Sequence, residues 1–422
     1  MLGFLAKGLL RDRSRSLFPL LTVAIGVSLT VLMDAYLRGA TDGIFRATAS
    51  FVSGHVRVTT RAAAREGTGA SNELALLGVG ELTRGLERAH PGMTWTPRIR
   101  FGGLVDVPDS AGQTRVQAPA VGLAVDLSEV SPEREILKLE QSLASGRLPS
   151  APGEVLLSDD FARRLGVGPG DRVTLVSSTM NGSMAVANFT LSGTVRFGVS
   201  AMDRAALLAD IGDARQALDM ADAADEVLGF LPGGYDDREA AKLAATFNAA
   251  QEGGGDEFAP EMNSLRVASG LGGMMDLIGA ASAVIVAVFV MAMSVVLWNA
   301  GLMGSLRRYG EIGIRLAVGE SKDAVYRALL VEAFLIGLVG SAAGTAIGFG
   351  FSLYLQEVGI NIGGMMKDAT MVIDDVIRAR ITPASYVVGF LPGLLATFVG
   401  AAISGLGVYK RQTAVLAKEF SG

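Results

Sequence analysis

Four long apolar runs restrict the fold of this chain more than any other feature of its sequence. They cover residues 17–37, 277–302, 328–355 and 386–408. Each run is close to the roughly 20 residues that an α-helix needs to cross a hydrocarbon core about 30 Å thick. Half of all residues are hydrophobic, and their concentration in a few runs is typical of a membrane protein. We therefore predict four transmembrane helices, over residues 17–38, 271–302, 326–355 and 384–408.

Lysine and arginine near the ends of these helices predict their orientation, because cytoplasmic loops carry an excess of both. Three segments lie on one side of the membrane if the helices alternate, and all three are rich in cations: residues 1–16, 303–325 and 409–422. The short loop 356–383 has more acidic than basic residues. Both termini are therefore expected in the cytoplasm, and residues 39–270 outside it.

Residues 39–270 have the composition of a soluble protein, and their length of about 230 residues suffices for one large or two small domains. The segment GEVLLSDDFARRLGVGPGDRVTLVSS predicts a strand, a helix capped by Ser158, a glycine turn and a second strand. Similar patterns predict helices at 79–89, 213–220 and 237–250, and strands at 95–107 and 226–231. The predicted fold class is a membrane α-helical protein with a large extracytoplasmic mixed α/β domain between its first two transmembrane helices.

The N-terminal residues leave alternatives open. Residues 1–16 fit either an amphipathic helix on the cytoplasmic leaflet or a charged flank that orients the first helix. The first apolar run fits either a retained anchor or a cleavable signal peptide. It has about 21 residues, more than the core of a signal peptide, and no clear A-x-A site follows it. These two observations favour the anchor.

Composition and missing motifs exclude several classes of function. The absence of cysteine excludes disulfides and thiolate metal sites, and a net charge of −5 argues against a general nucleic-acid-binding protein. The two histidines, His55 and His90, are too few for a histidine-based metal site, and no P-loop, G-x-S-x-G or H-E-x-x-H motif occurs. We predict no catalytic residue, metal site or cofactor site in this chain, and we expect His55 to be a half-buried strand residue.

Glycines recur at four-residue spacing in the last two apolar runs. They are Gly340, Gly344 and Gly348 in the third run, and Gly389 and Gly393 in the fourth. This spacing clears one face of a helix, so that a neighbouring backbone can approach it closely. We predict helix packing within the subunit, and the alternative is an interface between subunits.

Ionisable residues in the apolar runs are costly to place in lipid and usually have a purpose. Asp34, Arg38 and Asp276 lie near the ends of runs, where we expect each side chain to reach the lipid headgroups. Glu332 lies about one turn inside the third helix. It fits either a polar contact with an arginine of the preceding loop or extension toward the interface.

The loop 303–325 predicts a short rigid helix at the cytoplasmic surface. Residues 311–318 are long enough for about two helical turns, and Gly319 follows where a left-handed residue ends a helix most easily. Ser321 then caps the third transmembrane helix, with Asp323 in its first turn. The short helix carries apolar residues on all sides. Because lipid cannot cover all of these sides at once, the helix suits a groove on another protein. Adsorption to lipid headgroups is the alternative.

The same loop carries a family resemblance. The pattern R-x-x-E-I-G-I-x-x-A-x-G at residues 308–319, the E-A pair at 332–333 and the glycine-rich run after it resemble the FtsX/MacB class of ABC transporter permeases. Residues 146–175 are similar to the periplasmic core domain of that class. The segment SGHVRV, at 53–58, resembles the lipoprotein-releasing subfamily.

The resemblance implies an inner-membrane permease whose periplasmic domain has two subdomains, one interrupted by the other. The short helix of the loop would be the coupling helix that docks into an ATPase subunit. The residues carried over to this contact are Glu311, Ile312, Gly313, Arg315, Leu316 and Gly319. The complex would hold two ATPase subunits, which bind ATP and Mg²⁺, and a second permease subunit, identical or paralogous. Because this sequence contains no ATPase domain, the ATPase is expected on a separate chain.

The class is expected to work by mechanotransmission, in which closure of the ATPases moves the outer domains. The expected role is extraction of lipoprotein, or another amphiphilic substrate, from the membrane lipid for a periplasmic carrier or adaptor. One alternative is MacB-like efflux of antibiotics, peptides or haem. Another is an FtsX-like signalling scaffold, although about 230 residues outside the membrane are more than that role generally needs. A membrane-bound hydrolase is disfavoured because no nucleophile motif is present.

Overall fold

The structure is a computed structural model. It describes residues 13–67, 71–109, 112–232, 234–251, 255–270, 272–306, 309–362 and 376–406. These residues form two compact units, one from the described parts of 1–42, 278–360 and 377–422, the other from those of 43–277 and 361–376. We call them the helical unit and the mixed α/β unit. Most of the predicted amphipathic segment 1–16 and all of the predicted tail 409–422 lie outside the described residues.

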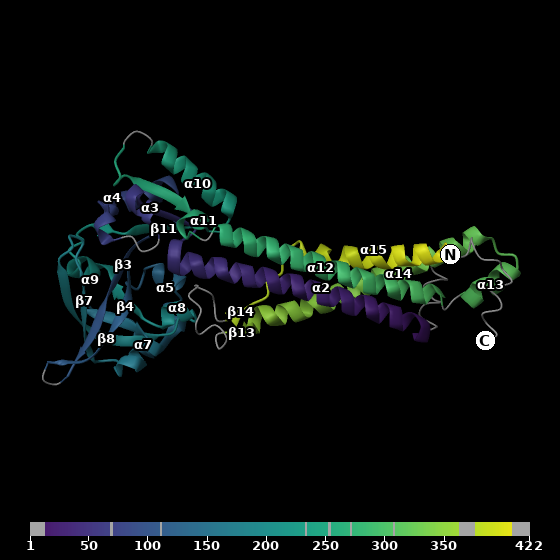
Figure 1. Ribbon diagram of the computed structural model, residues 1–422, viewed down its shortest axis with the longest axis horizontal. Coiled ribbons are helices and arrows are strands. Elements are labelled where there is room, and N and C mark those ends of the chain that lie inside the picture. Colours follow the sequence, from purple (N-terminus) through teal and green to yellow (C-terminus); the bar gives the residue numbers. More distant parts are fainter. Residues whose placement is uncertain are drawn as a thin grey trace. The chain divides into compact units, whose positions relative to one another are not determined.

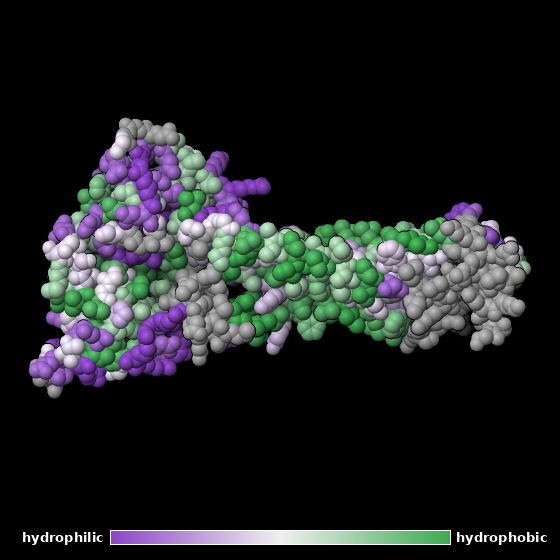
Figure 2. All heavy atoms as spheres, in the orientation of Figure 1, coloured by the Kyte–Doolittle hydropathy of each residue, from purple (hydrophilic) through white to green (hydrophobic). Residues whose placement is uncertain are grey.

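Four helices of the described chain are long and apolar enough to cross a membrane, as predicted. They are α2 (Arg13–Thr48), α12 (Gly272–Leu306), α14 (Lys322–Val358) and α15 (Ser385–Gly405). Figure 2 shows hydrophobic residues along them. The 36 residues of α2 rise about 54 Å at 1.5 Å per residue, more than the hydrocarbon core requires. The helix therefore continues beyond the predicted membrane span 17–38, after its apolar run stops, and the bounds of the span itself stay a prediction.

The glycines of α14 bring it against α2 in the same chain. A Cβ atom on Gly344 would lie 2.4 Å from the carbonyl oxygen of Ala24, so the two backbones touch where a larger residue would not fit. Equivalent Cβ atoms on Gly340 and Gly348 would lie 2.8 Å from Val23 and 2.9 Å from Ser28. The described contacts of these glycines are thus between helices of one subunit.

The glycines of α15 lie against α2 and α14. A Cβ atom on Gly389 would lie 2.7 Å from Val31, and one on Gly393 would lie 2.4 Å from Val27 and 2.8 Å from Ser341. Removal of side chains on this face lets all three helices approach and pack by dispersion.

A polar cluster joins α2 to the start of α15. Asp34 is 1% exposed; Arg38 Nε donates to both of its carboxylate oxygens at 2.9 Å, and Ser385 Oγ donates to Oδ2 at 2.8 Å. The expectation that Asp34 reaches lipid headgroups is therefore wrong, because protein covers its carboxylate. A buried carboxylate needs such partners to offset its lost hydration.

The mixed α/β unit is built on a ten-stranded sheet in the order β12-β1-β11-β3-β4-β9-β6-β8-β5, with β7 paired to β3 and β8 (Figure 1). Its strands are β1 (Val56–Thr60), β3 (Thr94–Pro108), β4 (Thr114–Val125), β5 (Leu143–Gly146), β6 (Glu154–Ser158), β7 (Arg172–Ser178), β8 (Met184–Val195), β9 (Ala206–Asp210), β11 (Glu226–Phe230) and β12 (Pro260–Ser264). Pairing is antiparallel except for β4 with β9 and β6 with β8. The sheet confirms the predicted mixed α/β character.

Short helices and two small strand pairs complete the unit. The helical elements are η1 (Ala49–Ser53), α3 (Arg61–Glu66), η2 (Asn72–Leu74), α4 (Val79–Ala89), α5 (Glu133–Ile136), α6 (Leu139–Ser142), α7 (Asp159–Leu165), α8 (Ser200–Asp203), α9 (Ile211–Ala217), α10 (Asp237–Ala250) and α11 (Leu265–Ala268). The strand pairs are β2 (Leu76–Leu77) with β10 (Ala223–Ala224), and β13 (Ile360–Asn361) with β14 (Val376–Ile377). α9 ends before the predicted 220, where Asp219 adopts a positive φ of 57°.

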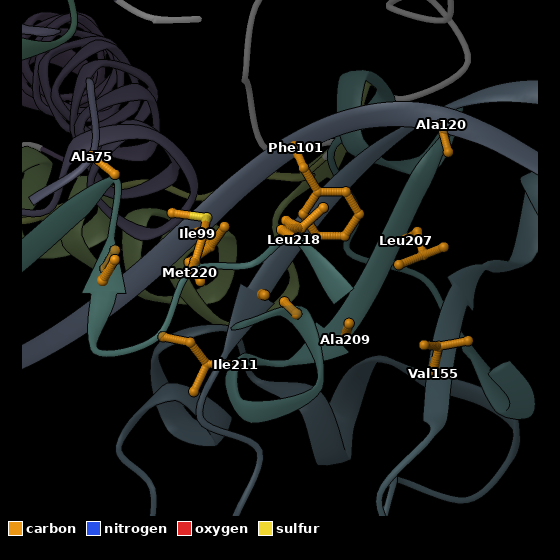
Figure 3. Packing of buried hydrophobic residues seen from close by; sticks show 14 of the residues in the cluster. Ala75, Ile99, Phe101, Ala120, Val155, Leu207, Ala209, Ile211, Leu218 and Met220 are labelled. Atoms are coloured by element: carbon orange, nitrogen blue, oxygen red, sulfur yellow. The ribbon is translucent and has the colours of Figure 1, made fainter. Parts of the chain in front are cut away.

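The long strand β3 joins the two parts of the sheet. Residues 94–98 pair with β11, and residues 99–108 pair with β4. Ile99 and Phe101 enter the main hydrophobic core (Figure 3). Phe101 pairs with Gly122 of β4, where an added Cβ would lie 2.1 Å from the phenyl ring. One strand thus serves both halves of the sheet, and the predicted division into two subdomains stays a prediction.

The close approach of α14 to α2 predicts that Gly344→Ala destabilises the helical unit. Its Cβ would meet backbone rather than a flexible side chain, and overpacking of this kind costs about 1–3 kcal/mol. The matched control is Gly350→Ala in the same helix, because nothing lies within 4 Å of a Cβ there. Reversible unfolding in mixed micelles measures both; equal stability of the two variants would contradict the packing described.

The contact between Phe101 and Gly122 predicts a similar difference within the sheet. Gly122→Ala should lower the stability of the mixed α/β unit by about 1–3 kcal/mol, because the phenyl ring has to move. Gly102→Ala is the control on the adjacent strand, where a Cβ has nothing within 4 Å. Thermal unfolding of the full chain, followed by near-UV circular dichroism, should separate the two variants. A Gly122→Ala protein as stable as the control would show that the ring is not confined there.

Candidate functional site

The loop between α12 and α14 folds as the short helix α13 (Tyr309–Ala317). Gly319 ends it with a φ of 100°, a conformation that side chains rarely tolerate. Its N–H donates to the carbonyl of Leu316 at 3.1 Å, and the N–H of Glu320 donates to the carbonyl of Arg315 at 3.1 Å. α14 begins at Lys322, and the side chain of Ser321 before it accepts from the N–H of Ala324. A tight turn therefore joins α13 to α14.

Arg315 is occupied by a local ion pair. Its Nε and Nη2 donate to the two carboxylate oxygens of Glu320, both at 2.7 Å. These hydrogen bonds lower the pKa of Glu320, so the pair is ionised at neutral pH. The pair closes the turn after α13. The sequence did not predict this pair, and the family resemblance assigned Arg315 to an ATPase contact instead.

The described apolar surface of α13 lies at its C-terminal end. Ile314 is 53% and Val318 84% exposed, whereas Leu316 is half-buried and Gly313 is buried. Ile314 and Val318 are four residues apart, so they share one face at the C-terminal end of the helix. Both belong to the apolar residues expected around this helix, although they were not among the residues carried over to the ATPase contact. Glu311 and Ile312 lie in α13, but their side chains are outside what the structure describes.

Glu332 lies within α14 and is half-buried. Two arginines of the preceding loop, Arg307 and Arg308, are outside the described residues. The predicted contact between Glu332 and a loop arginine stays a prediction.

A second constellation lies in the mixed α/β unit, at the end of the helix that starts with α2. The π-helical turn η1 (Ala49–Ser53) continues α2 and ends at Gly54, which has a φ of 62°. The N–H of Gly54 donates to the carbonyl of Ala49 at 2.9 Å. The next three carbonyls accept from arginines of β3: Ser50 from Arg98, and Phe51 and Val52 from Arg100, at 2.7 to 2.8 Å.

Each of these arginines is also held by a carboxylate. Arg98 Nε and Nη2 donate to the two oxygens of Glu133 at 2.7 and 2.8 Å, and both side chains are 0% exposed. Arg100 Nε donates to Glu226 Oε1 at 2.7 Å. We call Arg98, Arg100, Glu133 and Glu226 the arginine clamp. Bidentate guanidinium–carboxylate pairs fix the plane of the guanidinium as well as its position.

Further charged groups surround the clamp on one side. Arg57 Nη1 lies 3.7 Å from Glu226 Oε2, and the backbone N–H of Arg100 donates to Asp225 Oδ2 at 2.6 Å. Burial raises the pKa of Asp225 to about 7, although the hydrogen bond from Arg100 opposes this shift. A cavity of about 40 Å³ is lined by these residues and by Thr59 and Ser71, among others.

Sequence reasoning missed the clamp, although one signal was present. Arg98 and Arg100 are two residues apart in the strand segment WTPRIRF, so they share one face while Ile99 and Phe101 share the other. Two arginines on one face of an otherwise buried strand require acidic or carbonyl partners. The sequence does not show which partners these are.

His55 is half-buried, as expected, but it lies outside the strand in which it was expected. It is half-buried just before β1, and its Nδ1 accepts a hydrogen bond from the N–H of Leu231 at 2.8 Å. Burial lowers the pKa of His55 to about 4, so its imidazole is neutral at physiological pH. Within the described ranges, no group of three or more His, Asp or Glu side chains is arranged to hold a metal ion.

Comparison with known families gives two matches that divide the chain. The MacB-like periplasmic core domain matches residues 16–246, and the FtsX-like permease C-terminal region matches residues 283–413. The first match spans more than half of the 422 residues. The second includes α13 and the helices on both sides of it.

Individual relatives match shorter segments. The macrolide export ATP-binding/permease protein MacB of Rhodopseudomonas palustris (strain HaA2) is 30% identical over 105 residues, which are 24% of this chain and 15% of that protein. The protein of the same name from Chromobacterium violaceum is 43% identical over 63 residues, 14% of this chain and 10% of that protein. These matches therefore span a small part of the relatives' length.

A solved structure of the periplasmic region of MacB from Actinobacillus actinomycetemcomitans is also similar. It has a TM-score of 0.34 and 12% sequence identity, and the match covers 50% of this chain and 88% of that chain. The assignment rests on the two family matches, which agree with four membrane helices and a mixed α/β unit between the first two. The chain belongs to the FtsX/MacB family of ABC transporter permeases.

Proposed function

We propose that this chain is the non-catalytic permease subunit of an ABC transporter that works by mechanotransmission. In this proposal a partner ATPase binds α13, and its closure moves α2 and with it the periplasmic domain. The observation that carries the proposal is α13 itself, a short helix fixed between two membrane helices that exposes Ile314 and Val318. Family membership implies an ATPase partner, and such a surface suits a groove on that partner.

The proposal places ATP and Mg²⁺ on the partner rather than on this chain. The 422 residues contain no P-loop motif, and the proposed complex has two ATPase subunits in which ATP hydrolysis would take place. The names of the relatives combine ATP-binding and permease functions in one protein. We propose instead that the ATPase is a separate chain. A second permease subunit, identical or paralogous, would complete the complex.

The proposed orientation follows the distribution of cations. Both termini and α13 would face the cytoplasm, and the MacB-like domain would lie in the periplasm on an inner-membrane, multi-pass protein. The half-exposed cation Arg315 and the acid Glu320 beside it would then lie at the ATPase surface.

The proposed substrate is a lipoprotein or a similar amphiphile, taken from the membrane and passed to a periplasmic carrier. The segment SGHVRV supports this reading. A second candidate is efflux through an adaptor, and the names of the matched relatives, which are macrolide exporters, favour it. Both substrates would use the same movement of the periplasmic domain.

Docking through α13 predicts that Ile314→Asp together with Val318→Asp removes the ATPase from the complex. Two charges on an apolar contact would have to be desolvated without partners. Affinity purification of the tagged permease from its own membranes should recover at least about tenfold less ATPase, at an affinity loss of about 1.4 kcal/mol or more. The control is Val130→Asp, a 93% exposed position in the mixed α/β unit. Wild-type recovery from the double variant would contradict docking at α13.

The nature of the cargo can be tested on the intact complex. Mass spectrometry of the complex purified in mild detergent is expected to find an ATPase and acylated polypeptides, because an extracting permease holds its substrate before release. A deletion strain should in that case accumulate lipoprotein in the inner membrane and keep its wild-type macrolide resistance. Loss of resistance without lipoprotein accumulation would assign the chain to efflux instead.

A further inference from the structure

We propose that Arg98 and Arg100 are positioning residues that fix the end of the α2 helix to β3, so that displacement of this helix reaches the sheet. The inference rests on the proposed function, because it assigns the place where movement enters the periplasmic domain. It is carried by the hydrogen bonds between both guanidinium groups and three carbonyls of η1, those of Ser50, Phe51 and Val52.

The carbonyl end of any helix needs outside partners. The last four carbonyls receive no hydrogen bond from an N–H group of the same helix. Water or a following glycine turn usually supplies the missing donors. Here the N–H of Gly54 donates to the carbonyl of Ala49 only. The guanidinium groups of Arg98 and Arg100 donate to the carbonyls of Ser50, Phe51 and Val52. The helix therefore ends on side chains from a strand that lies 48 to 49 residues further along the chain.

Electrostatics favours this arrangement. The carbonyl end of a helix carries a partial negative charge, which cations stabilise. Arg98 is fully buried, so its attraction to that end and to Glu133 is screened little by water. η1 is a π-helical turn. Such turns are rare in proteins, and those that occur are often at functional sites.

The two carboxylates restrict the movement of the arginines that bind the end of the helix. We call this contact between η1 and β3 the joint. Glu133 of α5 holds Arg98 through two bonds, and Glu226 of β11 holds Arg100. Neither guanidinium can follow the helix end without breaking bonds to a second element. Four segments, η1, β3, α5 and β11, are thus tied at one point.

Stability alone does not account for such a cluster. Apolar residues of similar volume often replace buried ion pairs without loss of stability. Apolar contacts are non-directional, however, whereas short charge-assisted hydrogen bonds fix atoms in place. The helix concerned is α2, which contributes residues to both the helical unit and the mixed α/β unit.

The test uses Arg100→Lys in the full chain with its partners. Arg100 is chosen because its side chain is 34% exposed, whereas Arg98 is fully buried and its removal would leave Glu133 without a partner. Lysine keeps the charge but cannot bond Glu226 and both carbonyls in one geometry. The control is Arg147→Lys, which alters another arginine–glutamate pair, with Glu154, that does not contact η1.

Spin labels measure the joint directly, because the chain has no cysteine of its own. Labels at Arg46→Cys on α2 and Gly102→Cys on β3 are both at exposed positions of the mixed α/β unit. We expect one narrow distance population in the wild type and in Arg147→Lys. In Arg100→Lys the distribution should be at least twice as wide. An unchanged width overturns the inference.

Transmission is measured by a label at Val130→Cys in each permease subunit, before and after trapping with Mg-ATP and vanadate. Arg100→Lys should reduce the nucleotide-dependent change in distance at least twofold and leave ATP hydrolysis within twofold of the wild type. A joint that is loosened but transmits the full change overturns the inference. If the wild-type complex shows no nucleotide-dependent change, the proposed function fails, and the width of the 46–102 distribution still decides whether the clamp is rigid.

Discussion

A helix that crosses lipid and continues beyond it has to end somewhere with its carbonyl groups satisfied, and this requirement organises the structure. In α2 the apolar run ends near residue 37, but the helix and its π-helical turn continue to Ser53. Its last carbonyls are met by Arg98 and Arg100, whose charges are in turn met by Glu133 and Glu226. The sheet is built around the same strand, since β3 supplies both arginines on one face and the core residues Ile99 and Phe101 on the other.

The helical unit is held together mainly by close packing of small residues rather than by ion pairs. Lipid provides no hydrophobic force between helices, so they associate through close packing. Gly344 and Gly393 remove side chains where α14 and α15 meet α2, and the buried Asp34 adds a polar tie to Ser385. Small residues and one polar cluster thus hold three long helices together, while α13 is left as an exposed projection between α12 and α14.

Local and periodic features were predictable from the sequence, and long-range partners were not. The four membrane helices follow from apolar length, and α4 and α10 have their predicted bounds because amphipathic spacing is a local signal. The end of α2 does not follow from the apolar run, because loss of apolarity marks the edge of lipid rather than the end of a helix; the first strong break is Gly54. The clamp and the burial of Asp34 were missed because Glu226 lies 126 residues from Arg100, and Ser385 lies 351 residues from Asp34. Only the fold brings such pairs together.

In the proposed function, movement passes from an ATPase at α13 through the membrane helices to the periplasmic domain. The most direct test of this path is the sidedness of α13, because the path requires α13 and the mixed α/β unit to lie on opposite sides of the membrane. A cysteine at Val318 and one at Val130 can be labelled separately with a membrane-impermeant maleimide on intact spheroplasts. The account predicts labelling at 130 at once and at 318 only after the membrane is opened. Labelling of 318 on intact spheroplasts would contradict it.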